Sequence, residues 1–343
     1  MYLFSNEIVF RGHPDKVCDQ ISDALLDAYM ASDAYSRCGI EVMGGKNVIF
    51  VTGEVTSKSH VDVTEVVNRV LTDCGYDASK YRTLINIGLQ SPDIALGTNN
   101  DVNGAGDNGM MFGYATDETP EYLPKAMVIL QKFSQWYDEL RQKDPRFLSD
   151  GKAQITGEYY SDGSLAEIKT FTVCYQNTEE DRGSTDAVIL NKIIDLCDQY
   201  SVPLSGVLIN PTGKFLIGGF EGDAGLTGRK IVVDSYQGFA PVGGGAFSGK
   251  DPTKVDRTAA YKARQIAKRI VANDAEIHTA LIQLSYAIGL SRPLAIALTL
   301  NGTRVETVSD ELYEECSVRN MIDNMQLRNK KFEPLARFGH FKD

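Results

Sequence analysis

The chain has 343 residues, of which 43% are hydrophobic and 24% charged, and its net charge is −11. This length predicts two or three domains, and the composition excludes a mainly disordered chain. The acidic balance argues against nucleic acid or an anionic membrane as the main partner. No apolar run approaches the roughly 20 residues that span a bilayer. The first residues lack the pattern of a signal peptide, so we expect a cytoplasmic location.

The six cysteines are scattered along the chain, with no C-x-x-C pair and no flanking histidines. This spacing argues against a zinc site and against a disulfide framework. It suits a reducing compartment, which agrees with the expected location.

The first stretch of the chain carries alternating helical and strand patterns. Pro14 fits the first position of a helix, and apolar residues follow it at helical spacing. A short apolar run at residues 48–51 predicts a strand, and residues 61–74 predict a helix that ends at Gly75. A second strand is expected at residues 84–87.

Residues 91–109 are rich in asparagine, aspartate and glycine. Irregular segments of this length in compact domains are usually functional or disordered. We therefore interpret this segment as a mobile active-site loop that orders over bound ligands, with a passive connection as the alternative.

The middle stretch predicts a helix, a hairpin, a second helix and a strand, in that order, at residues 124–141, 153–176, 185–200 and 207–209. The last stretch opens with glycines near Gly218. It continues as a helix, two strands near Ser285 and Ala295, and a final helix near Glu311. Because helices and strands mix without strict βαβ alternation, the predicted class is α+β.

Residues 243–257, directly before a predicted helix, combine glycines with lysines and an aspartate. Glycines let backbone amides approach phosphate oxygens, and a helix N-terminus adds a favourable dipole. Lysines supply positive charge, while Asp256 offers a hard oxygen ligand to magnesium. We expect a polyphosphate ligand here, and a surface loop with solvated charges is the alternative.

The same segment satisfies the pattern G-x-x-x-x-G-K at residues 244–250. However, Asp251 stands where a P-loop has serine or threonine for magnesium, and no hydrophobic strand precedes the glycines. A P-loop is therefore not expected.

Two shorter motifs leave alternatives open. The motif Gly12-His13-Pro14-Asp15-Lys16 sets an imidazole, a carboxylate and an ammonium at the start of a helix. These groups could hold phosphate and metal, or they could simply cap the helix. The motif at residues 106–109 and its echo at 222–225 set an aspartate between glycines, which is usually a turn.

Together, these segments resemble the methionine adenosyltransferase (S-adenosylmethionine synthetase) family. The matching stretches follow the family's order between residues 4 and 341, and GGGAFSGKD and GHPDK are the most specific to it. Others include GEVT, GLQSPDI, GAGDNGMMFGYATDET, NPTGKFLIGG and GDAGLTGRKIVVDSY. The resemblance implies three similar α+β domains of sheets and helices around a pseudo-threefold axis. We place these parts at residues 1–95, 104–217 and 218–343.

The resemblance also implies an enzyme that makes S-adenosylmethionine from ATP and L-methionine. The methionine sulfur would attack C5′ of ATP, and the departing triphosphate would then be cleaved to pyrophosphate and phosphate. A thioether has no proton to lose, so no general base is needed, in agreement with a chain of four histidines and no Ser-His-Asp pattern. Mg²⁺ and K⁺ are the implied cofactors. The implied assembly is a homodimer with active sites at the subunit interface, sometimes paired into a tetramer.

The site residues implied by the family's motifs fall into four groups. The catalytic group, which would stabilise the departing triphosphate, is His13, Lys152, Arg229, Lys230 and Lys250. The other residues of the ATP site are Asp150, Lys214, Phe215, Ala246 and Asp107, of which Asp107 lies near the sugar or the methionine. Methionine would be held by Glu54, Gln90, Asp223 and Lys254. The metal ligands would be Asp15 and Asp256 for Mg²⁺ and Glu41 for K⁺.

Two alternative functions remain at this point. A phosphoryl-transferring ATPase or kinase built on the glycine-rich loop would make ADP instead of pyrophosphate and phosphate. A nucleotide-binding subunit without activity is the other alternative, and the intact lysines and aspartates count against it.

The chain departs from the family's pattern in a few places. Phe10 and Arg11 replace the family's usual Ser-Glu, which exchanges an acid for a base beside the first helix. Lys214 stands where arginine is common. The segment 91–109 is shorter than usual, and residues 317–336 match poorly.

Overall fold

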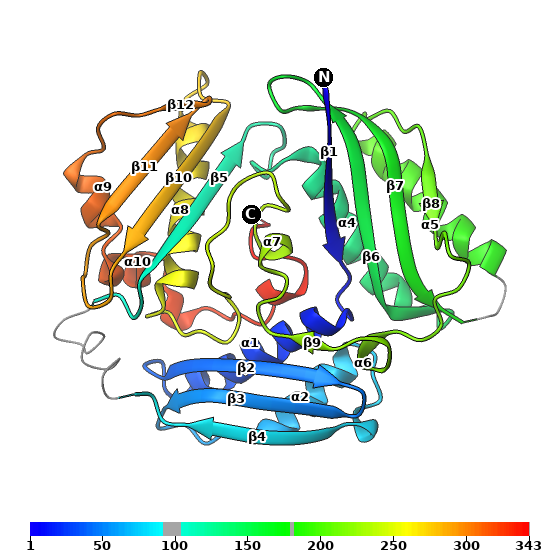
Figure 1. Cartoon of the computed structure of the whole chain (residues 1–343), viewed down its shortest axis with the longest axis horizontal. Coiled ribbons are helices and arrows are strands. Elements are labelled where there is room, and N and C mark those ends of the chain that lie inside the picture. The colour runs from blue at the N-terminus through cyan, green and yellow to red at the C-terminus, as the bar shows by residue number, and fades with distance from the viewer. Residues whose placement is uncertain (92–103, 179–181, 343) are drawn as a thin grey trace.

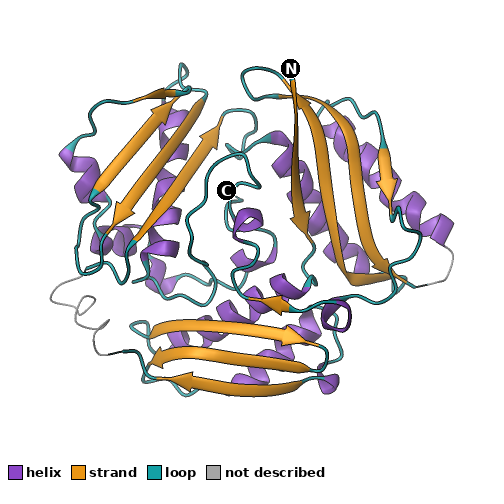
Figure 2. Ribbon diagram, in the orientation of Figure 1, coloured by secondary structure: helices purple, strands orange, loops and turns teal. Residues whose placement is uncertain are grey.

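The computed structural model describes residues 1–91, 104–178 and 182–342 (Figure 1). Within these ranges, three four-stranded sheets stand around the centre of the molecule, with helices behind each sheet (Figures 1 and 2). This arrangement confirms the predicted α+β class with three similar parts. Among the described helices, none has the length and apolar character needed to cross a membrane.

The first sheet has the strand order β4-β3-β2-β9. β2 (Arg37–Gly45) and β3 (Val48–Thr56) are antiparallel, and β4 (Arg82–Gly88) runs parallel to β3. The short strand β9 (Gly225–Leu226) comes from the last part of the chain and pairs with β2. The two strands predicted in this region lie within β3 and β4.

The second sheet has the strand order β1-β6-β7-β8. β6 (Phe147–Tyr159) and β7 (Leu165–Asn177) form the predicted hairpin, and β8 (Val207–Ile209) has the predicted bounds. β1 (Tyr2–Val9), which the sequence patterns did not predict, pairs antiparallel with β6.

The third sheet has the strand order β12-β11-β10-β5. β10 (Thr279–Tyr286) and β11 (Ala295–Leu300) are the two strands expected near Ser285 and Ala295, and β12 (Thr303–Arg304) extends the edge. β5 (Gly109–Thr116) pairs antiparallel with β10.

Long helices cover one face of each sheet (Figure 1). α1 (Pro14–Ser32) and α2 (Val63–Asp73) lie behind the first sheet, and α4 (Lys125–Arg141) and α5 (Arg182–Gln199) behind the second. α8 (Val255–Asn273) packs on the third. These helices agree with the predicted ones, including the start of α1 at Pro14.

Shorter elements fill the centre and the edges. The helices α7 (Ile231–Asp234) and α10 (Val318–Asn324) lie toward the centre and beside the third sheet, respectively (Figure 1). The remaining short elements are α6 (Gly219–Gly222), α9 (Asp310–Glu315) and the 3₁₀ turns η1 (Ala78–Lys80), η2 (Leu327–Asn329) and η3 (Leu335–Arg337).

The active-site loop predicted at residues 91–109 falls mostly at residues 92–103, which lie outside the described chain. Near its end, Ala105 is fully buried. Its amide donates to the carbonyl of Leu290 at 2.9 Å, and its carbonyl accepts from the amide of Gly289 at 2.8 Å. This end of the segment is therefore fixed against the third part of the chain.

Candidate active site

A cavity of about 250 Å³ lies between the glycine-rich loop and strands β2 and β3. Several residues that the sequence singled out line it together. They are Glu41, Glu54, Asp107, Ala246, Lys250, Lys254 and Asp256. The structure thus unites two predicted methionine ligands, two ATP contacts, a catalytic lysine and two predicted metal ligands.

Glycines allow the acidic side chains of this cavity to approach the backbone closely. A Cβ atom at Gly39 would lie 2.5 Å from Oε1 of Glu54, so any larger residue would displace that carboxylate. A Cβ atom at Gly245 would collide with the carboxylate of Asp256. A larger residue at either position would therefore force the neighbouring carboxylate to move.

Each lysine of the cavity is paired with an aspartate a few residues further along or back in the chain. Nζ of Lys250 lies 2.5 Å from Oδ2 of Asp256, and Nζ of Lys254 lies 2.6 Å from Oδ2 of Asp251. Burial alone would raise the pKa of Asp251, but the charges of Lys254 and Arg37 hold that pKa below its ordinary value. The ammonium group of each lysine is thus already in contact with a carboxylate.

Asp251 also explains why this loop is not a P-loop. Its carboxylate accepts hydrogen bonds from the amide of Cys38 at 2.8 Å and from the amide of Thr253 at 3.0 Å. The side chain that stands at the P-loop serine position therefore ties the loop to β2. α8 begins at Val255, directly after the loop, as the sequence predicted.

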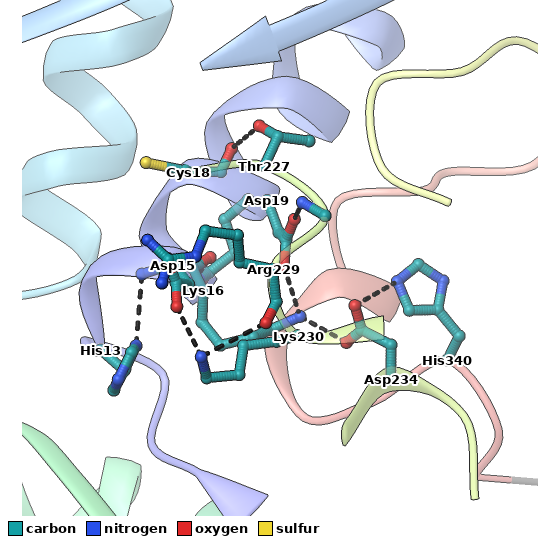
Figure 3. A network of polar contacts seen from close by, with 12 residues as sticks. His13, Asp15, Lys16, Cys18, Asp19, Thr227, Arg229, Lys230, Asp234 and His340 are labelled. Atoms are coloured by element: carbon teal, nitrogen blue, oxygen red, sulfur yellow. Dashed lines mark hydrogen bonds and ion pairs between the residues drawn. The ribbon is translucent and has the colours of Figure 1, made fainter. Parts of the chain in front are cut away.

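A second group of predicted residues gathers at the N-terminus of α1 (Figure 3). We call it the His13 group, and its members are His13, Asp15, Arg229 and Lys230. Nδ1 of His13 accepts a hydrogen bond from the amide of Asp15 at 3.2 Å, which confirms helix capping for His13. Oδ2 of Asp15 lies 2.5 Å from Nζ of Lys230, and its Oδ1 accepts from the amide of Leu226 at 2.9 Å. Arg229 is exposed beside Lys230.

His13 is held neutral in this environment. Burial, reinforced by the charge of Lys230 and then of Lys152, lowers its pKa to about 3. Since Nδ1 accepts the amide hydrogen bond of Asp15, the proton of the neutral ring is assigned to Nε2. His13 can therefore donate one hydrogen bond to an oxygen of a ligand.

Asp150 and the two glycine-flanked aspartates accept hydrogen bonds from backbone amides. Burial raises the pKa of Asp150, whose Oδ2 accepts from the amide of Gly219 at 2.8 Å. Asp107 and Asp223 each accept a hydrogen bond from the amide of the following residue, at 2.7 Å and 2.8 Å. Both aspartates lie at bends of the chain, and Asp107 also lines the cavity.

Gln90, Lys214 and Phe215 lie neither in the described lining of the cavity nor at the N-terminus of α1. The amide of Gln90 donates to Oγ1 of Thr56 at 3.3 Å, at the end of β4. Lys214 and Phe215 follow β8, where the carbonyl of Phe215 accepts from the amide of Asn177 at 2.9 Å. Their roles in ligand binding remain predictions.

The sequence interpretation missed three aspartates that follow Asp15 on one face of α1, at intervals of four residues. Asp19 accepts from the amide of Gly228 at 2.9 Å, and Asp23 from the amide of Gly249 at 2.9 Å. Asp27 accepts from the amide of Phe332 at 2.9 Å. The repeat of aspartate in GHPDKVCDQISDALLDA was the available signal. Through these contacts at Gly228, Gly249 and Phe332, the three carboxylates attach the last part of the chain to α1.

Asp19 also belongs to a buried network behind the His13 group (Figure 3). Nζ of Lys16 lies 3.0 Å from Oδ2 of Asp19 and 2.5 Å from Oδ1 of Asp234. Burial raises the pKa of Asp234 to about 7, although the charge of Lys16 opposes this shift. Nε2 of His340 lies 4.0 Å from Oδ2 of Asp234.

Arg11, one of the departures from the family's pattern, faces away from the His13 group. Its Nε donates to Oε1 of Gln20 at 2.9 Å, and its Nη1 lies 3.3 Å from Oδ2 of Asp138 on α4. The positive charge of Arg11, which stands where the family has an acidic residue, is therefore paired with Asp138 on α4.

Among the described residues, no group of three or more His, Cys, Asp or Glu side chains is placed to hold a metal ion. Asp15 and Asp256 each contact a different lysine, as given above. A metal site that uses both would need further ligands, such as phosphate oxygens or a second copy of the chain. The Mg²⁺ and K⁺ assignments remain predictions.

Comparisons with known proteins bear on the entire chain. Family models described as the N-terminal, central and C-terminal domains of S-adenosylmethionine synthetase match residues 1–90, 102–215 and 217–343. A protein named S-adenosylmethionine synthase from Synechococcus sp. (strain CC9902) is 41% identical over 387 aligned positions, covering 99% of this chain and 94% of the relative. A protein of the same name from Clostridium tetani (strain Massachusetts / E88) is 40% identical over 373 positions, covering 99% and 94%. The similarity thus extends over all three parts.

Proposed function

The chain belongs to the S-adenosylmethionine synthetase family and makes S-adenosylmethionine from ATP and methionine, and from this premise we propose how its residues carry out the reaction. The methionine sulfur attacks C5′ of ATP, the triphosphate leaves, and the bound triphosphate is cleaved to pyrophosphate and phosphate. The observation that carries this proposal is the cavity beside the glycine-rich loop, where Lys250 and Lys254 stand among carboxylates.

The main chemical difficulty is the leaving group. A triphosphate departs with about four negative charges, and preorganised positive groups that stabilise such charge contribute several kcal/mol. Lys250 suits this task, because its contact with Asp256 holds the ammonium group at the cavity wall. When ATP binds, phosphate oxygens replace the carboxylate as the partner of the ammonium.

The opposite charges of Glu54 and Lys254 in one cavity suit a zwitterionic amino acid. Glu54 would hold the ammonium of methionine, and Lys254 its carboxylate. Gln90 and Asp223 would complete the methionine site. The nucleotide would be contacted by Asp150, Lys214, Ala246 and Asp107, with the half-buried ring of Phe215 stacked on adenine.

The family is generally metal-dependent. For this chain we assign Mg²⁺ to Asp15 and Asp256 and K⁺ to Glu41. Both aspartates offer hard carboxylate oxygens, and each already contacts a lysine ammonium at 2.5 Å. With phosphate oxygens as further ligands, these carboxylates would hold Mg²⁺. A bound Mg²⁺ would neutralise phosphate charge.

We further assign each active site to two copies of the chain, with the cavity from one subunit and the His13 group from the other. Two observations support a dimer. The residues of the His13 group do not line the described cavity. The faces of the sheets opposite the helices carry exposed apolar side chains, among them Met43 and Met110, whose neighbours Val42 and Met111 are buried in the core. Such a face favours a symmetric partner. In this arrangement His13 donates its Nε2–H to a phosphate oxygen.

The test of the chemistry is incubation with ATP and methionine, with and without Mg²⁺ and K⁺. The proposal expects S-adenosylmethionine, pyrophosphate and phosphate, with no ADP. Formation of ADP would instead support the kinase alternative, and absence of all products would support the inactive subunit.

The shared site has a separate test. Lys250→Ala and His13→Ala should each be nearly inactive alone. After mixed refolding, half of the dimers would be mixed, and each would keep one intact site, so about a quarter of the wild-type activity should return. If the mixture stays as inactive as the separate variants, each active site lies within one chain.

A further inference from the structure

Tyr76 contacts two segments, far apart in the sequence, that belong to the candidate active site. Its hydroxyl donates to the carbonyl of Gly12, the residue before His13. Its ring lies against Gly219, where an added Cβ atom would collide with the ring and the hydroxyl of the tyrosine. The amide of Gly219 donates in turn to Oδ2 of Asp150 at 2.8 Å. One partly buried tyrosine thus touches the backbone beside two predicted site residues.

The end of α2 brings Tyr76 to this place. The amide of Gly75 donates to the carbonyl of Thr72, and the amide of Tyr76 donates to the carbonyl of Leu71, both at 2.9 Å. Gly75 has a φ of +87°, the left-handed conformation that closes a helix in this pattern and favours glycine. Backbone hydrogen bonds therefore fix the direction of the chain after α2, and with it the position of Tyr76.

Aromatic packing holds the ring of Tyr76. Its centre lies 6.1 Å from that of Phe220 and 6.3 Å from that of Tyr81. The rings of Phe220 and Tyr81 lie 5.8 Å apart, and Phe220 is buried in the core. Rings at such distances attract each other in tilted and edge-on arrangements. The hydroxyl of Tyr76 is therefore carried on a fixed ring.

The hydroxyl of Tyr76 holds the peptide group that joins Gly12 to His13. The carbonyl of this peptide accepts from Tyr76, and its amide donates to the carbonyl of Phe10 at 3.0 Å. A Cβ atom at Gly12 would collide with Ser149, so the backbone fits closely against β6. Burial raises the pKa of Tyr76 well above its ordinary value, so the phenol keeps the proton that it donates.

We propose that Tyr76 is a positioning residue for His13, an inference that rests on the proposed role of His13 as a donor to a phosphate oxygen. The amide of Asp15 holds the imidazole at Nδ1, at 3.2 Å (Figure 3). The hydroxyl of Tyr76 holds the backbone from which the imidazole projects. Together the two contacts set the place of Nε2, and small displacements of a catalytic group lower the rate steeply.

The test variant is Tyr76→Phe, which removes one oxygen atom and keeps the ring, so the aromatic packing should remain. The matched control is Tyr286→Phe, because the hydroxyl of Tyr286 also donates to a backbone carbonyl, that of Cys316 at 2.6 Å. Tyr286 does not belong to the described lining of the cavity. Each variant is made in the wild type and in His13→Asn, which lacks the imidazole but keeps a helix cap.

Tyr76→Phe should lower kcat about tenfold in the wild type, because the displaced imidazole stabilises the leaving group less well. It should cause no further fall in His13→Asn, since residues that act as a unit are not additive. Tyr286→Phe should leave kcat unchanged in both backgrounds. An equal fall in both backgrounds would give the Tyr76 hydroxyl a merely structural role and overturn the inference. An unchanged kcat in Tyr76→Phe, with His13→Asn impaired, would also overturn it and leave the proposed function intact.

An NMR measurement gives a result that needs no turnover. With isotope labels on Cε1 of the four histidines, the signal that His13→Asn lacks belongs to His13. Tyr76→Phe should shift this signal, whereas Tyr286→Phe should leave it in place. A normal kcat in His13→Asn would contradict the proposed role of His13, and the signal would then decide alone whether Tyr76 holds the imidazole. A His13 signal that is the same in Tyr76→Phe and in the wild type would overturn the inference.

Discussion

Asp23 of α1 and Arg257 of α8 form an ion pair in which both side chains are fully buried, at 0% exposure. Nη2 of the arginine lies 2.7 Å from Oδ1 and 2.6 Å from Oδ2 of the aspartate. The same pair holds the glycine-rich loop, because Asp23 accepts from the amide of Gly249 and Nη1 of Arg257 donates to the carbonyl of Lys250 at 3.2 Å. The position of Lys250, the proposed catalytic lysine, therefore depends on two residues outside the cavity.

Asp23→Asn should lower the free energy of unfolding by about 3–5 kcal/mol, because it leaves the guanidinium buried without its counter-charge. Urea denaturation measures this loss. The control is Asp323→Asn, which breaks the pair of Asp323 with Arg319, whose side chains are 60% and 72% exposed. That change should cost less than about 1 kcal/mol. Similar losses in the two variants would mean that the buried pair is not the element that joins α1 to α8.

Lys250→Ala should leave the fold intact and lower kcat by at least about a hundredfold, as for other single groups that stabilise charge in a transition state. Lys250 lies at the cavity wall and not in the core, so its loss creates no packing defect. Steady-state kinetics and circular dichroism measure the two effects. Lys143→Ala removes an exposed lysine and should keep normal kcat. A near-normal kcat in Lys250→Ala would remove this lysine from the mechanism.

The fold was predictable where its signals are local. The start of α1 follows from Pro14, and the β6–β7 hairpin from its turn, where Oδ1 of Asp162 accepts from the amide of Ser164 at 2.9 Å. β1 and β5 were missed because their partners lie far along the chain, as in the pairing of Phe4 with Gly157. Short segments that form strands only through distant partners carry little periodicity of their own.

In the candidate site, too, the local motifs were predictable and the contacts between distant residues were not. Motifs identified the lysines and aspartates, since glycines, charge and helix starts are visible in sequence. They gave no indication of the partner of each group, and the pairing of Lys254 with Asp251 instead of Asp256 is decided by loop geometry. The buried role of Asp23 was missed because a mid-helix aspartate usually faces solvent. Only the opposing arginine, far along the chain, makes its burial favourable.

Asp15→Asn and Asp256→Asn should each shift the dependence of rate on Mg²⁺ to higher concentration. A neutral amide is a poorer ligand for a hard cation than a carboxylate, while the shape of the side chain is kept. The measurement is initial rate against Mg²⁺ concentration at saturating ATP and methionine. Asp323→Asn, at an exposed position, should leave the curve unchanged. Unchanged curves in both site variants would place the metal on other residues.

The buried imidazole of His13 makes stability depend on pH in a defined direction. Burial and the charge of Lys230 lower its folded pKa to about 3, against an ordinary value of 6.5. Between these values the unfolded chain binds a proton that the folded chain does not. The contribution of His13 to stability is therefore present above pH 6.5 and is lost as the pH falls toward 3.

His13→Asn removes this titration but keeps a good helix cap. From pH 7 to pH 5, the free energy of unfolding of the wild type should fall by about 2 kcal/mol relative to this variant, at about 1.4 kcal/mol for each pH unit below 6.5. Urea denaturation at several pH values measures the difference.

Asp27→Asn serves as a control of opposite sign, because burial raises the pKa of Asp27 to about 6. The folded state then binds the proton more tightly, so the wild type should gain stability relative to Asp27→Asn as the pH falls from 6 toward 4. Parallel curves for the wild type and His13→Asn would show that the folded protein binds a proton at His13 as readily as the unfolded chain, and so that this imidazole is not held neutral.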